Sequence, residues 1–125
     1  MAQAQVADRT FLDLRRAVAA DEIVRALAQV GFTQREIAAA AGATDRSVRN
    51  WEATGAIRAD YGERIRDLTE IALVLSTTMT PRGVRQWFSA RNRLLGGRRP
   101  IDLMATPERD RVREAAASFV EGSYA

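Results

Sequence analysis

Apolar residues recur at intervals of three and four along almost the whole chain, the spacing that places them on one face of an α-helix. Two short stripes precede the middle of the chain, formed by Phe11, Leu14 and Val18 and then by Ile23, Leu27 and Val30. No segment alternates with the period of two that a half-buried strand requires. The pattern predicts an all-α protein with about seven short-to-medium helices.

Local signals in the first half of the chain place two short helices close together. Thr33 and Glu36 form a capping box, so a helix is expected to begin at Gln34. Gly42 can end this helix, and Thr44 can cap the next one. Two short helices joined by a tight, glycine-containing turn predict a helix-turn-helix. The residues expected on its inner face are Ile37, Ala38, Ala41, Val48 and Trp51.

The longest predicted helix spans residues 58–78. Its apolar seam follows a heptad-like spacing and comprises Tyr61, Ile65, Leu68, Ala72, Leu75 and Met79. Ile71 and Val74 widen this surface beyond one face. Two interpretations are open: the helix lies deep in the core, or its widened face contacts a second copy of the chain.

Two threonine–proline pairs predict helix starts in the second half of the chain. Thr80-Pro81 reads as the cap and first residue of one helix, and Thr106-Pro107 as those of the last helix. The apolar positions of the first are Val84, Trp87 and Phe88, and those of the last are Val112, Ala115, Ala116, Phe119 and Val120. Between them the glycine pair at 96–97 breaks the pattern, and Pro100 can open a short turn. The last helix is expected to end at Gly122.

The composition argues against an enzyme. The chain has no cysteine and no histidine, so it lacks thiolate metal ligands and the commonest general base. The carboxylate pairs Asp60 with Glu63 and Glu108 with Asp110 sit in predicted first turns of helices, where acids are favoured anyway. We therefore expect no metal and no cofactor. No membrane-spanning run and no signal peptide is recognisable, which predicts a cytoplasmic protein.

The positive charge is concentrated in one segment. All 19 basic residues are arginine, a bias that either a GC-rich coding sequence or selection for bidentate contacts explains. Residues 1–56 carry seven arginines and seven acids, whereas residues 80–100 carry six arginines and no acid. This segment fits an acidic protein partner at least as well as a phosphate backbone. Trp87 within it is expected in the core, and Arg98-Arg99 can equally be read as a solvated loop.

The second helix of a helix-turn-helix enters the DNA major groove. The residues expected to contact DNA are Gln34, Asp45, Arg46, Ser47, Arg49 and Asn50. Arg46 suits the acceptor edge of guanine and Asn50 the edge of adenine, whereas Gln34, Ser47 and Arg49 suit phosphates. The other interpretation is a helix-turn-helix kept only as a packing unit. Because residues 1–56 carry no net charge, DNA binding by one copy is expected to be weak. We therefore expect either a homodimer that reads two half-sites or help from a bound partner.

The segment TQREIAAAAGATDRSVRNWE resembles the Xre/Cro-like helix-turn-helix of phage repressors. This resemblance implies base reading by Asp45, Arg46 and Asn50 and phosphate anchoring by Gln34 and Ser47. Asp45 departs from what the role requires, because a carboxylate repels phosphate unless it accepts from cytosine.

Residues 84–125 resemble the C-terminal toxin-binding domain of the Xre/MbcA/ParS-like antitoxins. The shared features are a Trp-bearing helix, Asn92, a Leu-Gly corner, the run Pro-Ile-Asp-Leu, and a last helix ending in Gly-x-Tyr. With the preceding helix-turn-helix, the resemblance covers residues 20–125. The expected organisation is a flexible N-terminus (1–8), a helix-turn-helix DNA-binding domain (9–56), a connecting core helix with a possible dimer contact (57–79) and a small helical toxin-binding domain (80–125).

The resemblance implies a type II antitoxin that covers the active site of a cognate toxin and represses its own operon by binding operator DNA. The usual toxins in such pairs carry a RES domain and degrade NAD, and others are related ADP-ribosyl-transferring proteins. The residues expected to bind the toxin are Arg93, Arg98, Arg99, Gly122, Ser123, Tyr124 and Ala125. The alternative is a free-standing Xre-family transcriptional repressor without a toxin partner.

Overall fold

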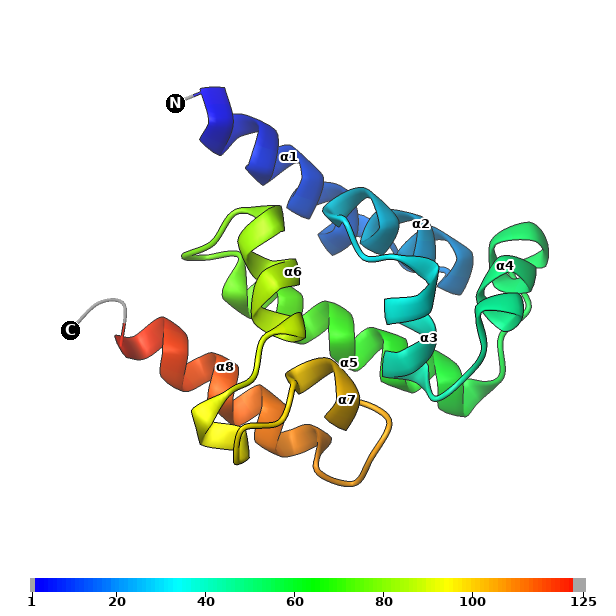
Figure 1. Cartoon of the computed structure of the whole chain (residues 1–125). Coiled ribbons are helices and arrows are strands. Elements are labelled where there is room, and N and C mark those ends of the chain that lie inside the picture. Colours follow the sequence, from blue (N-terminus) through cyan, green and yellow to red (C-terminus); the bar gives the residue numbers. More distant parts are fainter. Residues whose placement is uncertain (1, 123–125) are drawn as a thin grey trace.

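The computed structural model of the chain describes the backbone of residues 2–122 and the side chains of residues 9–122. Within that range every regular element is a helix, which confirms the all-α prediction. The elements are α1 (Ala2–Arg16), α2 (Ala20–Val30), α3 (Gln34–Ala41), α4 (Asp45–Thr54), α5 (Ala59–Leu75), α6 (Pro81–Ser89), the 3₁₀ turn η1 (Arg93–Leu95), α7 (Pro100–Leu103) and α8 (Arg109–Gly122) (Figure 1). The longest of them is α5, as the sequence predicted.

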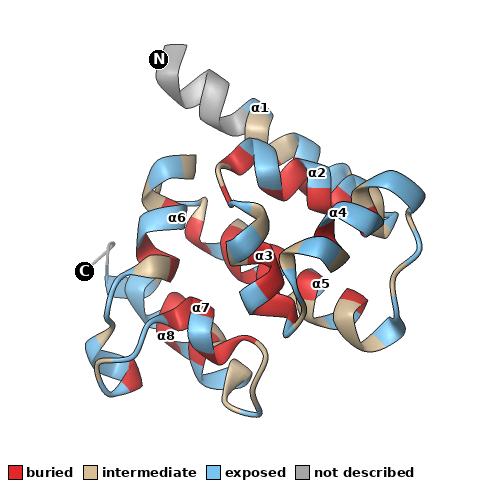
Figure 2. Cartoon of the chain, turned by 45° about the vertical axis from the view of Figure 1, so that its right-hand side comes forward, coloured by how far each residue is buried: buried red, intermediate tan, exposed pale blue. Residues whose placement is uncertain are grey.

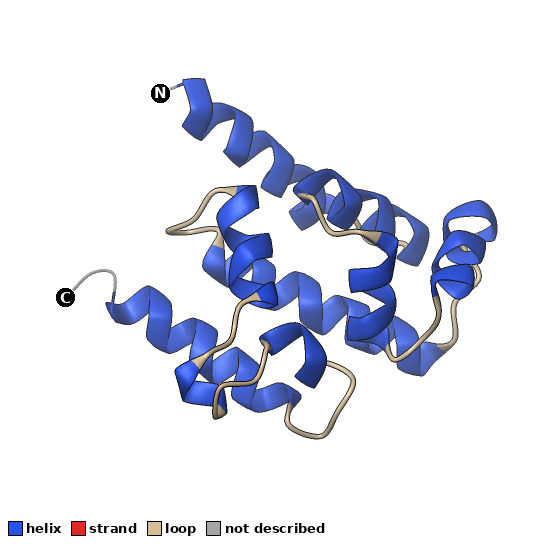
Figure 3. Cartoon of the chain, in the orientation of Figure 1, coloured by secondary structure: helices blue, strands red, loops and turns tan. Residues whose placement is uncertain are grey.

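The helix α5 runs through the middle of the molecule and packs against α1, α2, α3 and α8 (Figure 1). At one end of the molecule α4 stands beside α3, α6 and α8 lie towards the opposite end, and α7 packs against α3, α6 and α8. The connections between helices are short (Figure 3). The two segments with candidate functions therefore lie on either side of one central helix.

Local capping chemistry sets the helix starts that the sequence predicted. Thr33 and Glu36 form the expected capping box at α3, and the Thr44 side chain accepts the amide hydrogen of Ser47 at α4. Thr80 caps α6 in the same way, with a proline at the first helical position. Gly42 ends α3 in the left-handed region, with φ at 75°. Each of these signals depends on residues within one turn, so the sequence alone suffices to predict them.

Two expectations about element ends were wrong. Val18 was placed in the first apolar stripe, but α1 ends at Arg16 and Val18 is 79% exposed in the connection to α2. The last helix was expected to start at Thr106-Pro107, but it starts at Arg109. The Thr106 hydroxyl donates to the Leu103 carbonyl (2.7 Å) and accepts from the Glu108 amide (3.1 Å). Thr106 therefore closes a turn after α7, and the helix can begin only after that turn.

The backbone of residues 2–8 continues α1 in the structure. The flexibility expected for residues 1–8 stays a prediction.

One continuous cluster of buried side chains joins the two halves of the chain (Figure 2). It extends from Phe11 on α1 to Ala116 on α8 and includes the predicted inner residues of the helix-turn-helix. Phe32, which precedes α3, meets Phe88 on α6 edge to face, with ring centroids 5.6 Å apart. Such aromatic contacts stabilise beyond the area that they bury. The helix-turn-helix and the C-terminal helices therefore share one core.

The widened apolar face of α5 is divided between core and surface. Ile71 is fully buried within the single chain, whereas Val74 is partly exposed. Ile65, Leu68 and Leu75 of the seam are also buried. The core interpretation of this helix is therefore correct for the seam and for Ile71.

Charged side chains connect α5 to α8. The Asp67 carboxylate lies 3.2 Å from the Arg109 guanidinium and 3.1 Å from that of Arg113. Arg113 also reaches Glu70 and Asp110, each at 3.1 Å. A network of this kind holds its members with less loss of side-chain entropy per contact than an isolated surface pair does. It fixes the α8 position along α5.

Candidate functional site

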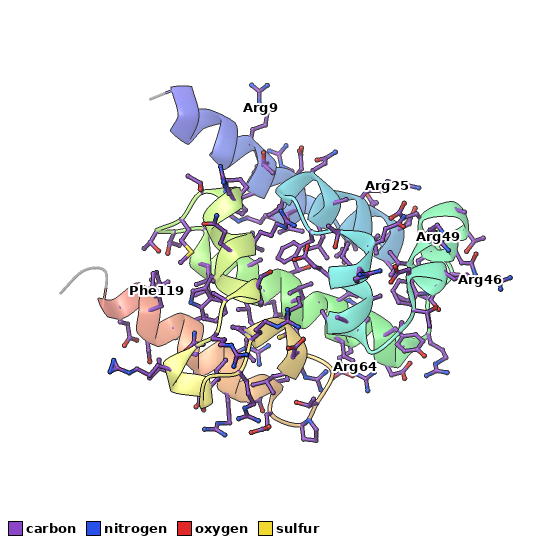
Figure 4. The ribbon with its side chains drawn as sticks, viewed as in Figure 1. Arg9, Arg25, Arg46, Arg49, Arg64 and Phe119 are labelled. Carbon is purple, nitrogen blue, oxygen red and sulfur yellow. The ribbon has the colours of Figure 1, made fainter. Side chains whose placement is uncertain are left out.

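The predicted DNA-reading helix α4 presents a polar outer face. Val48 and Trp51 are buried beneath it, while Arg46, Arg49 and Asn50 are exposed. Figure 4 shows Arg46 projecting from α4 at the edge of the molecule, with Arg49 on the same helix. Among the described residues neither arginine takes part in an ion pair. Both guanidinium groups are therefore available to an anionic ligand.

The remaining predicted DNA contacts already have partners within the chain. The Asp45 carboxylate lies 4.0 Å from the Arg35 guanidinium, which offsets part of its charge. The Ser47 hydroxyl lies 3.0 Å from that of Thr44, and the Gln34 amide donates to Glu52 at 3.4 Å. These contacts are exposed or only part-buried. They orient the side chains around α4.

The Glu36 carboxylate on α3 connects this helix to α6. Glu36 accepts the Thr33 amide hydrogen at 2.9 Å, the Arg85 guanidinium at 3.2 Å and the Ser89 hydroxyl at 3.0 Å. Burial acts to raise the pKa of Glu36, but the hydrogen bonds from Thr33, Ser89 and Arg85 outweigh it and lower the pKa. The sequence revealed Glu36 as a capping residue. Its contacts with α6 span about fifty positions of chain, and no local pattern signals them.

The segment after α6 forms a tight corner around η1. The Asn92 side chain accepts the Leu94 amide hydrogen at 2.9 Å, and the Asn92 amide donates to the Arg98 carbonyl at 3.0 Å. Gly96 and Gly97 adopt φ values of 67° and 81°, which the reversal of the chain requires. Leu95 is buried beneath the corner. The Leu-Gly element of the predicted toxin-binding domain is therefore an ordered turn.

The predicted toxin-binding arginines fall into two groups. Arg98 forms a two-pronged ion pair with Glu108, and Arg99 forms one with Asp102. Arg93 is exposed on η1 and forms no ion pair with any residue that the structure describes. Arg98 and Arg99 therefore hold the corner to its neighbours, and Arg93 is left for a ligand.

A surface hollow of about 560 Å³ adjoins this corner. Its lining comprises Arg91, Gly97, Arg98, Arg99, Asp102 and Leu103. Three of these side chains are cationic and one is anionic, so the hollow favours an acidic ligand.

The predicted tail contacts are described only in part. Gly122 is exposed at the end of α8. Ser123, Tyr124 and Ala125 lie outside the residues that the structure describes. Phe119, one turn before the end of α8, remains partly exposed (Figure 4).

In each of the two carboxylate pairs, one member has its pKa lowered by an arginine. The hydrogen bond from Arg58 lowers the pKa of Asp60 to about 2. Hydrogen bonds from Arg98 and then Arg111 lower the pKa of Glu108. A general acid or base works best with a pKa near the operating pH. These carboxylates have the electrostatics of structural ion pairs. In the described range, no group of three or more acidic side chains is arranged to hold a metal ion.

The described helices include none that is long and apolar enough to cross a membrane. The exposed arginines of α4 and of the η1 corner are suited to contact with phosphate or carboxylate.

Comparison with known proteins gives a family match in the C-terminal half of the chain. Residues 76–115 match the antitoxin Xre/MbcA/ParS C-terminal toxin-binding domain. This range contains α6, η1 and α7 and the first half of α8. No solved structure matches the chain.

Two relatives extend the similarity over most of the chain. A probable mycobacterial cidal antitoxin of Mycobacterium tuberculosis, Rv3188, is 50% identical over 111 residues, which cover 89% of this chain and 96% of that protein. The mycobacterial cidal antitoxin MbcA of Mycobacterium bovis is 28% identical over 108 residues, covering 86% of this chain and 96% of that protein.

The all-α fold, the capped helices α3 and α4 and the arginine-bearing corner therefore belong to a protein of the antitoxin class. The chain is a member of the Xre/MbcA/ParS antitoxin family.

Proposed function

We propose that this chain is the antitoxin of a type II toxin–antitoxin system. It binds a cognate toxin through the C-terminal half, covers the toxin's active site, and represses its own operon by binding DNA through α4. The toxin is of the RES type and degrades NAD, or is a related ADP-ribosyl-transferring protein. The antitoxin itself acts in the cytoplasm as a binding protein without catalytic activity.

The observation that carries this proposal is the match of residues 76–115 to a toxin-binding domain. Within that range Glu108 and Asp102 are already paired with Arg98 and Arg99, and Arg93 forms no ion pair among the described residues. We therefore expect the toxin to carry an acidic rim around its active site, complementary in charge to these arginines. The toxin-binding residues predicted from the sequence, Arg93 foremost, remain the candidates.

The proposal of DNA binding rests on the free outer face of α4. Arg46 and Asn50 are exposed and suited to base edges, and Arg49 to phosphate. The balanced charge of residues 1–56 argues that one copy binds weakly, so the repressor is a homodimer that contacts two half-sites. Since α4 and α8 lie towards opposite ends of the molecule (Figure 1), one chain can hold DNA and toxin together.

The test is co-expression of the full chain with the protein encoded by the adjacent reading frame. We expect a complex that co-purifies and has no NAD-consuming activity, and we expect that the toxin expressed alone consumes NAD. The double variant Arg46→Glu, Arg49→Glu should still form the complex but no longer retard the operon's promoter DNA. Substitutions are preferred to truncation here, because removing residues 80–125 would open the shared core.

Two outcomes contradict parts of the proposal. If the wild-type chain forms no complex but retards its own promoter, it is a free-standing Xre-family repressor. If the complex forms and the double variant retards DNA as well as wild type, α4 is not the DNA-reading element.

A further inference from the structure

The tight turn at η1 exposes one apolar side chain, that of Leu94, to solvent. Leu94 is 59% exposed, although its neighbour Leu95 is buried. Exposed leucines are common on proteins and need no explanation when they stand alone. Leu94 differs because the surrounding chain is fixed by contacts on both sides of it.

The contacts that fix the corner come from backbone and side chains alike. The Gly97 amide donates to the Asn92 carbonyl at 2.9 Å, which closes the loop below Leu94. The Arg98 guanidinium donates to the Leu95 carbonyl at 2.8 Å and is itself held by Glu108. A residue whose backbone is already fixed loses less conformational entropy when a partner binds it. Leu94 is therefore preorganised as a contact residue.

The two arginines that precede Leu94 in the sequence form no ion pairs among the described residues. Arg91 and Arg93 are exposed and form no ion pair among the described residues. Arg98 and Arg99, which are just as exposed, both have acidic partners. The contrast separates two arginines that brace the corner from two that precede Leu94 closely in the sequence and have no ion pair among the described residues. Arginine is enriched among the residues that dominate protein interfaces, and such residues cluster in well-packed, desolvated pockets.

We propose that Leu94 is the apolar anchor of the toxin interface, and that it inserts into an apolar pocket of the toxin rimmed by carboxylates that pair with Arg91 and Arg93. This inference rests on the proposed antitoxin function and names the contact that supplies its affinity. Arg98 acts on binding through the corner that it braces, as a positioning residue.

The test is the dissociation constant between the full chain and the adjacent-frame protein, measured by calorimetry for wild type and surface variants. Leu94→Glu places a charge in the apolar pocket, and we expect binding to weaken by at least about thirtyfold. Leu94→Met keeps the apolar surface and should bind within about threefold of wild type. Val18→Glu is the matched control, because Val18 is exposed to an even greater degree and lies in the connection between α1 and α2.

The arginines have their own pair of variants. Arg91→Glu with Arg93→Glu should weaken binding by at least about tenfold, and the loss should shrink at high salt as the charges are screened. Arg46→Glu with Arg49→Glu carries the same charge change on α4 and should leave toxin binding unchanged. Circular dichroism of each variant confirms that the fold is retained.

The outcomes distinguish this inference from the proposed function. If wild type binds and Leu94→Glu binds equally well, Leu94 is not the anchor although the antitoxin function stands. If Val18→Glu weakens binding as much as Leu94→Glu does, the effect is not specific to the corner and the inference fails. If the wild-type chain binds no toxin, both the inference about Leu94 and the proposed antitoxin function are wrong.

Discussion

Glu36 illustrates how one side chain can serve two parts of a fold. Its carboxylate completes the capping box of α3 and accepts two donors from α6. All three hydrogen bonds favour the ionised form, and they outweigh burial. Because the folded-state pKa lies below the unfolded-state value, Glu36 contributes stability that is present above the unfolded pKa. That contribution is lost as the pH falls through the folded pKa.

Replacing the carboxylate with its neutral isostere should remove this pH-dependent contribution. We expect Glu36→Gln to lower the free energy of unfolding by about 1–2 kcal/mol at pH 7, because the Arg85 ion pair and a charge-assisted bond are lost. The difference should be smaller at pH 3, because the wild-type carboxyl takes up a proton as the pH falls towards its lowered pKa. Urea unfolding of both proteins at the two pH values measures this. An equal difference at both would mean that the charge of Glu36 is irrelevant to stability.

At the scale of helices, the sequence correctly predicted those helix starts that depend on hydrogen bonds within one turn. The caps at Thr33, Thr44 and Thr80 are correct because each involves an amide within three residues of the threonine. The start of the last helix was misplaced because Thr106 has a second use, its hydroxyl bond to Leu103. Whether a threonine caps a helix or closes the preceding turn depends on the packing of that turn, which its own sequence does not specify.

Two glycines should respond in opposite ways to the same substitution. Gly42→Ala should cost about 1–2 kcal/mol, because φ is positive and a Cβ would lie 3.2 Å from that of Ala105. Gly62 lies inside α5, where a Cβ would meet nothing closer than 3.8 Å. Gly62→Ala should therefore stabilise by about 0.5–1 kcal/mol. Thermal melts of the two variants provide the comparison, and destabilisation by both would contradict the backbone argument.

The link between α5 and α8 rests on Asp67 more than on its neighbour. The Asp67 side chain is 20% exposed and holds two arginines, whereas that of Glu70 is 66% exposed and holds one. We expect Asp67→Asn to cost about 1–2 kcal/mol and Glu70→Gln less than about 0.5 kcal/mol. Denaturant titrations at low and high salt test this ranking. If both substitutions lower the free energy of unfolding equally, the network does not depend on Asp67, its least exposed member.

For the whole molecule, the shared core predicts that both halves unfold together. Trp51 lies in the helix-turn-helix and Trp87 on α6, and both belong to the one buried cluster. Single-tryptophan proteins made with Trp87→Phe or Trp51→Phe report on each half by fluorescence. Each protein should give the same midpoint by fluorescence as by circular dichroism. A helix-turn-helix signal that persists after the C-terminal signal is lost would mean two independent domains.

The sequence also predicted which side chains of α4 are exposed. Exposure of Arg46, Arg49 and Asn50 followed from the burial of Val48 and Trp51 on the opposite face of one short helix. The roles of the C-terminal arginines could not be assigned in this way. Arg98 and Arg93 look alike in the sequence, and only the position of Glu108 after the chain has turned back separates them. Local periodicity therefore predicts which side chains face outward, and tertiary contacts decide which of them are free.

The contacts of Glu36 also constrain how such proteins can be recombined. A chimaera that joins residues 1–79 of this chain to the C-terminal half of a relative keeps Glu36 but replaces the donors that face it. Where the incoming helix supplies no counterpart of Arg85 and Ser89, a part-buried carboxylate is left short of donors. Exchange of the two halves between family members is therefore least disruptive when the incoming half supplies equivalents of these two donors.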